Sequence, residues 1–192
     1  MALPLSANTI REALDRADSR HWTRKPPLSM RGQLAYLFKQ YRHDSAALAH
    51  RLQTDPAALR VLRTLEQTPQ DHPLRPAVER EVIRLWQPRV RRRAHEAIIA
   101  NNGHMMLSFR AWLGFTAAAG SSDDPRLRFL TLSLTAPYPQ RLFAAQHQRE
   151  PEEALRTILN GALSACYFHR DRPALAKESV SLERIDFLEF YY

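Results

Sequence analysis

The hydrophobic spacing of the chain changes at Asn101-Asn102-Gly103, and this change constrains the fold more than any other sequence feature. Before the turn, apolar residues recur every three to four positions, as in amphipathic helices. After it, apolar runs of about eight residues are typical of strands. We therefore predict an α+β protein with an all-α region over 1–100 and a small α+β domain over 104–192.

The region before the turn is predicted to be a series of short helices separated by proline and polar turns. Pro26-Pro27 breaks the first of them, Ser29 is an expected N-cap, and Pro56 stands where a helix accepts proline. Pro88 is expected to end or kink a further helix. The predicted helices lie at about 10–17, 29–41, 46–52, 56–67, 76–86 and 89–100.

The region after the turn is predicted to have the element order ββααβ. The expected strands cover 106–113, 127–134 and about 180–190, and the expected helices lie near Leu142-Phe143 and over about 154–167. A loop of small residues over 114–125 joins the first two strands. This order is typical of a small α+β domain.

The charge of the chain is basic and unevenly placed. There are 28 Arg or Lys and 20 Asp or Glu residues, giving a net charge of +8. Residues 1–98 hold 18 of the basic and ten of the acidic residues, whereas the remainder is neutral. A polyanion such as DNA is the expected partner of the first half. Arginine outnumbers lysine 25 to 3, a bias that a GC-rich genome would also produce.

Several functional classes are not supported by the sequence. The single cysteine, Cys166, rules out a disulfide framework and a cysteine-based zinc site, and the eight histidines show no metal-ligand spacing. The sequence contains no Walker loop, dinucleotide glycine pattern or nucleophile elbow. No apolar run approaches 18 residues, and the N-terminus lacks a signal-peptide core. We expect a cytoplasmic protein of the nucleoid, with no membrane partner and no intrinsic cofactor.

Residues 44–67 fit a helix-turn-helix, in which the second helix reads DNA. The expected core of the motif is formed by Ala49, Leu52, Ala58, Leu59, Leu62 and Leu65. The outer face of the second helix carries side chains suited to phosphates or guanine edges, namely Arg60, Arg63, Thr64 and Gln67. The same spacing would also produce an ordinary αα-hairpin, and Gln53 occupies the turn position where glycine is usual.

A basic segment over 88–93 is the second expected DNA contact. Its arginines are Arg89, Arg91, Arg92 and Arg93, and we add Arg51 on the first motif helix to the predicted DNA-binding residues. Binding through such groups would depend strongly on salt. The alternative is a solvated helix face without a partner.

The loop over 114–125 holds the groups that are best suited to chemistry. It offers hydroxyls from Thr116, Ser121 and Ser122, close to the carboxylates of Asp123 and Asp124. Adjacent carboxylates can help to hold Mg²⁺, and a nearby hydroxyl could then act as a nucleophile. In the alternative interpretation, one of the two aspartates only caps a turn before Pro125.

The sequence resembles the telomere terminal proteins of actinomycete linear replicons. The most specific match is Phe115-Thr116-Ala117-Ala118 followed by residues 120–126, Gly-Ser-Ser-Asp-Asp-Pro-Arg. Further matches occur in the same order over about 31–190: Arg31-Gly32-x-Leu34-x-Tyr36-Leu37, Trp86-Gln87-Pro88-x-Val90-Arg91, Ala165-x-Tyr167-Phe168 and Ile185-Asp186-Phe187-x-Glu189-Phe190.

The resemblance implies a protein primer that becomes covalently attached to the 5′ ends of linear DNA. The acceptor hydroxyl of that family corresponds to Thr116, and a partner DNA polymerase supplies Mg²⁺ and the dNTP. Such a protein is modified by the polymerase and is not itself a turnover enzyme. The resemblance also implies a helix-turn-helix, binding to duplex or single-stranded telomeric ends, a telomere-associated recruiting protein and self-association.

The chain departs from the family pattern at three places. Gln53-Thr54 replaces a Gly-Val pair, Val61 and Leu62 stand where tryptophan and basic residues are expected, and Ala119 replaces a frequent proline. Ser121 and Ser122 remain rival acceptors. A transcriptional regulator with a ligand-binding or dimerising α+β domain is the main alternative function, and an accessory protein that binds DNA without chemistry is a third.

Overall fold

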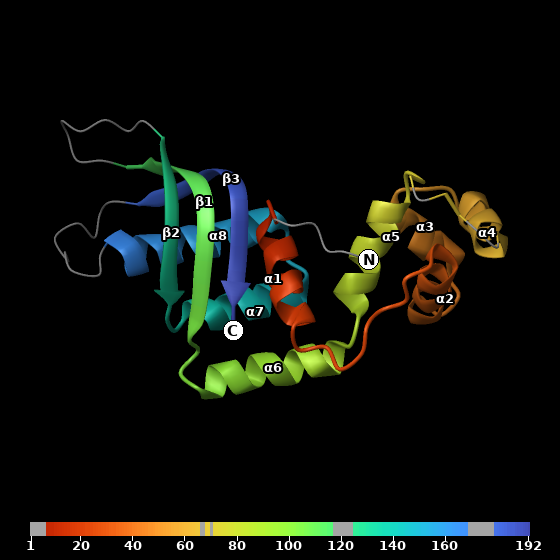
Figure 1. Ribbon diagram of the computed structural model, residues 1–192, viewed down its shortest axis with the longest axis horizontal. Helices are drawn as coiled ribbons and strands as arrows, with labels where there is room; N and C mark the ends of the chain where they lie inside the picture. Colours follow the sequence, from red (N-terminus) through yellow and green to blue (C-terminus); the bar gives the residue numbers. More distant parts are fainter. Residues whose placement is uncertain (1–6, 66–67, 70, 117–124, 169–178) are drawn as a thin grey trace. The chain divides into compact units, whose positions relative to one another are not determined.

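The computed structural model describes residues 7–65, 68–69, 71–116, 125–168 and 179–192 (Figure 1). The chain divides into two compact units. Unit 1 is formed by Trp22–Val90, and unit 2 by Ala2–His21 together with Arg91–Tyr192. Unit 1 is therefore an insertion in the chain of unit 2.

All the regular secondary structure in the described residues of unit 1 is helical. Three of its described helices begin after a side chain that accepts backbone N–H groups, namely Ser29, Asp44 and Asp55. The helices are α2 (Met30–Gln40), α3 (Ser45–Leu52), α4 (Pro56–Thr64) and α5 (Arg75–Leu85).

The helices of unit 1 share one apolar core. Leu34 and Leu37 of α2, Leu48 of α3, Leu59 of α4 and Val82 of α5 are all completely buried within it. Burial of such side chains stabilises a fold by about 1.5–3 kcal/mol each. The amphipathic spacing in the sequence thus predicted the inward faces of α2, α3 and α5, and of α4 at Leu59 and Leu62.

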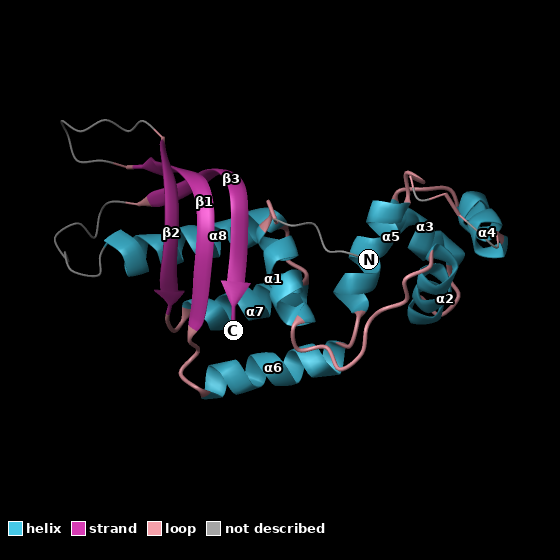
Figure 2. Cartoon of the chain, viewed as in Figure 1, coloured by secondary structure: helices cyan, strands magenta, loops and turns pink. Residues whose placement is uncertain are grey.

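Unit 2 is an α+β structure, which confirms the predicted fold class (Figure 2). After the turn at 101–103, its elements follow the predicted order ββααβ. The elements are α1 (Ile10–Ser19), α6 (Pro88–Ala100, which starts in unit 1), β1 (Met105–Phe115), β2 (Arg126–Leu134), α7 (Tyr138–Gln148), α8 (Glu152–Leu163), the π-helical turn η1 (Ser164–Phe168) and β3 (Val180–Tyr191).

The three strands form an antiparallel sheet with the order β2-β1-β3. Figure 1 shows α1, α7 and α8 on one side of this sheet. Residues of β1 alternate between the two faces. The odd-numbered residues Met105, Leu107, Phe109, Ala111 and Leu113 are buried in the core beneath the helices.

The division of the chain differs from the predicted boundary at 101–103. Ile10, Ala13, Leu14 and Ala17 of α1 are buried in the core of unit 2, so the first helix belongs with the sheet. Trp22–Val90 contains 12 basic and six acidic residues. Unit 1 therefore carries a net charge of +6 out of the total of +8.

Candidate functional site

Helices α3 and α4 form the two-helix arrangement predicted over 44–67. Gln53 ends α3 in the left-handed region, with φ 53° and ψ 48°, and the carboxylate of Asp55 accepts the N–H of Ala57 at the start of α4. A left-handed residue is what allows so short a turn, which explains why glycine is usual there. Leu59 and Leu62 point into the core of unit 1.

Two details of α4 differ from the prediction. The helix ends at Thr64, before the predicted end at about Gln67, and Gln67 lies outside the described residues. Ala58 and Leu65, expected in the core, are exposed. The buried stripe of α4 is therefore limited to Leu59 and Leu62.

The outer face of α4 carries the polar side chains that were predicted to contact DNA. Arg60, Arg63 and Thr64 are all exposed. The guanidinium of Arg63 lies 5.0 Å from the ring centre of Phe38, and the hydroxyl of Thr64 donates to the carbonyl oxygen of Val61 at 2.8 Å. The two arginines are thus presented to solvent from one helix.

Arg51 has a structural contact as well as an exposed surface. Its Nε donates to the buried carboxylate of Glu81 at 3.0 Å, and Tyr41 donates to the same carboxylate at 2.5 Å. Burial alone would raise the pKa of Glu81, but the hydrogen bonds from Arg84 and Tyr41 outweigh this and lower it. Arg51 therefore helps to hold α3 against α5.

The basic segment splits into exposed and buried arginines. Arg89, Arg92 and Arg93 are exposed. Arg91 is buried, with its Nε 2.8 Å from Oδ2 of Asp18 and its Nη2 3.4 Å from Oδ1 of Asp15. The prediction that Arg91 contacts DNA does not fit this position, because the guanidinium neutralises carboxylates inside unit 2.

Arg91 is part of a polar group that we call the Asp18 cluster: Asp15, Asp18, Arg91, His95, Gln146 and Tyr192. Gln146 donates to Oδ2 of Asp18 at 2.9 Å, and the Tyr192 hydroxyl donates to Oδ1 at 2.7 Å. These contacts join α1, α6, α7 and the end of β3. The cluster was not predicted from the sequence, although Asp18 follows Leu14 by four residues and so lies on the apolar face of its helix.

The two carboxyls of the cluster have opposite shifts in pKa. Burial raises the pKa of Asp15 from 3.8 to about 6. Burial would also raise the pKa of Asp18, but the hydrogen bond with His95 and the charge of Arg91 lower it below its ordinary value. Asp18 is thus the anionic centre of the cluster.

Thr116, the predicted acceptor, lies directly after β1 and is exposed. Its backbone N–H donates to the carbonyl oxygen of Ser179 at 3.0 Å, and its hydroxyl contacts the hydroxyl of Ser179. The backbone N–H of Ser179 in turn donates to Thr116 Oγ1 at 3.2 Å. The ladder between β1 and β3 therefore continues to Thr116 and fixes its hydroxyl at the solvent-exposed end of the sheet.

The other groups of the predicted loop lie outside the described residues. These are Ser121, Ser122, Asp123 and Asp124, so their arrangement around Thr116 remains an expectation. Among the residues that the structure does describe, no group of three or more His, Cys, Asp or Glu side chains is placed to hold a metal ion.

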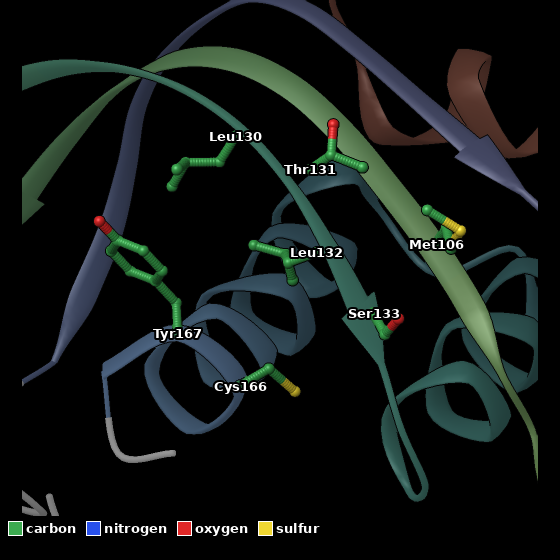
Figure 3. Close-up of a pocket in the computed structure, with 7 residues that line it drawn as sticks. All are labelled: Met106, Leu130, Thr131, Leu132, Ser133, Cys166 and Tyr167. Carbon is green, nitrogen blue, oxygen red and sulfur yellow. The ribbon is translucent and has the colours of Figure 1, made fainter. Parts of the chain in front are cut away.

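A hollow of about 340 Å³ lies between β2 and η1 (Figure 3). Cys166 and Tyr167 of η1 lie opposite Leu130 and Leu132, which belong to β2. Met106, Thr131 and Ser133 complete its lining. This volume is at the lower end of the range for small-molecule sites.

No protein-family model, curated protein or solved structure matches the chain significantly. Within the described part of the chain, no helix combines the length and apolar character needed to cross a bilayer.

Proposed function

We propose that this protein binds the ends of a linear DNA and provides the Thr116 hydroxyl as a primer for a DNA polymerase. The observation that carries the proposal is the position of Thr116. Its side chain is exposed at the end of a central strand, within the motif that resembles the telomere terminal proteins. Such a hydroxyl can enter the active site of another protein while the sheet keeps its backbone in place.

The proposed reaction is a nucleotidyl transfer onto Thr116. The threonine oxygen attacks the α-phosphorus of a dNTP, and a phosphodiester bond forms to the side chain. The bond between the α- and β-phosphates breaks, pyrophosphate leaves, and the hydroxyl proton passes to a base of the polymerase or to water. The partner polymerase supplies the Mg²⁺ that stabilises the negative charge on the phosphate oxygens during this transfer.

Unit 1 supports the DNA-binding half of the proposal. It holds a net charge of +6, and α4 presents Arg60 and Arg63 to solvent after a helix-turn-helix type of turn. Arginines on such a helix are suited to phosphates and guanine edges. In this proposal, unit 1 positions the protein on DNA while unit 2 presents the acceptor.

The test is a labelling reaction with the full chain, the DNA polymerase of the same host, Mg²⁺ and a radiolabelled dNTP. We expect one nucleotide to be attached to the peptide that contains Thr116. Thr116→Ala should abolish this label, and Thr116→Ser should restore it because serine keeps the hydroxyl. Ser179→Ala is the matched control, since Ser179 contacts Thr116 but is not the acceptor.

Two results would contradict the assignment. Undiminished label in Thr116→Ala would move the acceptor elsewhere, and peptide mapping would then distinguish Ser121 from Ser122. No label on any peptide, with a polymerase that extends ordinary primers, would refute priming itself.

The hollow beside β2 favours a second candidate, a transcriptional regulator whose unit 2 binds a small ligand. A regulator would bind an internal duplex operator in footprinting, would not become covalently labelled, and would change its affinity for that operator with the ligand. A gene located at a replicon end would favour the primer.

A further inference from the structure

The sheet of unit 2 has one face that none of the described helices of unit 2 covers. Helices α1, α7 and α8 lie on the opposite face in Figure 1. The even-numbered residues of β1 point to the uncovered face, and they are Met106, Ser108, Arg110 and Trp112. We call this surface the open face.

Large apolar side chains are exposed on the open face. Phe129 is 70% exposed, Met106 48%, Tyr191 43% and Leu127 37%. A soluble protein has little reason to leave a phenylalanine so exposed on a regular strand unless the surface has a partner.

The register of the strands arranges these side chains in rows across the sheet. Arg110 of β1 is directly opposite Phe129 of β2 on one side and Phe187 of β3 on the other. Trp112 lies in the next row, between Leu127 and Arg184. Residues directly opposite one another share a face, so every strand contributes aromatic rings to one surface.

Arginines are interleaved with the rings. Arg184 lies over Trp112 at 5.2 Å, and Arg20 lies over Tyr191 at 4.7 Å, each measured from the guanidinium carbon to the ring centre. Each of these two rings therefore already has a guanidinium group over one face, and Arg20 is also paired with Glu189. Arg110 and Arg184 share one carboxylate, Asp186, at 3.5 and 3.2 Å, which leaves a positive charge beside the rings.

Aromatic faces with interleaved arginines match the chemistry of unpaired bases joined by phosphates. Bases stack on the rings in a way that tolerates any sequence, and guanidinium groups bind the backbone. Duplex DNA fits this surface less well, because its bases are already stacked on each other and offer only their edges.

We propose that the open face binds single-stranded DNA, as a second DNA site separate from α3 and α4. Thr116 lies directly after β1 and follows Trp112 by four residues, a distance of about 13 Å along an extended chain. Resting on the proposed function, the open face would hold the unpaired end of the DNA close to the acceptor hydroxyl.

The test measures binding of the full chain to a fluorescent 20-nucleotide oligothymidylate and to a mixed-sequence duplex of the same length. Phe129→Ala should weaken binding of the single strand by about tenfold, as is typical for the loss of one stacked base. Phe129→Trp should retain the affinity. Ile99→Ala, which truncates an exposed apolar residue of α6, is the matched control and should change neither affinity.

Duplex binding separates this site from α4. Phe129→Ala should leave the duplex affinity unchanged, whereas Arg60→Gln with Arg63→Gln should weaken the duplex and spare the single strand. Equal loss of both affinities in Phe129→Ala would overturn the proposal, as would a single-strand affinity that Phe129→Ala does not alter. A dimer that Phe129→Ala converts to monomer, without loss of single-strand binding, would assign the open face to a second copy of the chain.

The outcome is independent of the priming experiment. Thr116→Ala should not alter the affinity for oligothymidylate, so single-strand binding without priming would refute only the proposed function. Priming by a protein that does not bind the oligothymidylate would refute only the role of the open face.

Discussion

Asp18 and His95 are 77 residues apart in the chain, yet Nε2 of His95 lies 2.6 Å from Oδ1 of Asp18. Both side chains are buried, and the His95 ring stacks on Phe143 with 3.7 Å between ring centres. The contact joins α1 to α6 inside unit 2, across the point where unit 1 is inserted. It ties the two ends of the insertion to the same core.

The first prediction concerns Asp18→Asn. The amide removes the negative charge that neutralises Arg91, so a buried cation loses its closest partner. We expect unit 2 to lose about 3 kcal/mol of stability. Hydrogen exchange measured by mass spectrometry should show faster exchange in β1 and β3, with α3 and α4 unchanged. Glu96→Gln makes the same change of charge at an exposed position of α6 and should alter neither the stability of unit 2 nor the exchange of its strands. Equal effects of the two substitutions would contradict the role of Asp18 as the partner of Arg91.

The second prediction concerns the pH dependence of Asp15. Burial raises its pKa from 3.8 to about 6, so the folded state binds this proton more tightly than the unfolded state. The stabilising contribution is therefore complete below about pH 4 and is lost as the pH rises through about 6. Asp15→Asn cannot ionise, so its stability relative to the parent should increase from pH 4 to pH 7 by up to about 3 kcal/mol.

Urea titrations at pH 4 and pH 7, followed by the hydrogen exchange of β1 and β3, measure this difference in stability. Glu12→Gln on the same helix is the matched control. If the stability of Asp15→Asn differs from that of the parent by the same amount at both pH values, burial does not raise the pKa of Asp15, and the prediction is wrong.

The third prediction concerns Gln53→Gly. Gln53 has a φ of 53°, and the left-handed region costs a residue with a Cβ about 1–2 kcal/mol, which glycine does not incur. Glycine also loses more backbone entropy on folding, so the expected net gain in the stability of unit 1 is up to about 1 kcal/mol. Ala47→Gly within α3 should instead destabilise by about 1 kcal/mol. Urea denaturation measures both, and a loss of stability in Gln53→Gly would refute the predicted strain.

The fourth prediction concerns the exposed arginines of α4. Arg60→Gln with Arg63→Gln should weaken binding to duplex DNA and reduce the slope of log affinity against log salt by up to about 2, since each phosphate contact contributes about 0.9. The control replaces Arg42 and Arg80, two exposed arginines of unit 1 outside α3 and α4, with glutamine. If the control lowers the affinity and the slope equally, α4 is not the DNA-reading helix.

The element order of unit 2 was predictable because its strands and helices differ in hydrophobic period. The position of α1 was not. Ile10, Leu14 and Ala17 show that one face of the helix is buried, but the period cannot show which core covers that face. Only the contacts with the sheet reveal that the first helix and the last strand share one core.

The candidate site was predicted unevenly for a similar reason. A run of arginines indicates a polyanion partner, but composition cannot show which arginine side chain points into the core. Arg91 and His95 are four residues apart, so they share a helix face, and that face is turned toward Asp18. The open face was missed because apolar residues on both faces of a strand are expected when both faces are covered.

The insertion of unit 1 has a consequence for how such a protein can change. The chain leaves unit 2 after α1 and re-enters it in α6. Near these two points, Oδ2 of Asp18 in α1 lies 2.8 Å from Nε of Arg91 in α6. The two junctions of the insert therefore meet at one place in the host fold. Because these junctions are adjacent, the inserted helical unit can be replaced by a different helical unit without altering the order or register of the strands of unit 2. In the proposed function, the DNA sequence bound by unit 1 could therefore change between replicons while β1 and Thr116 stay the same.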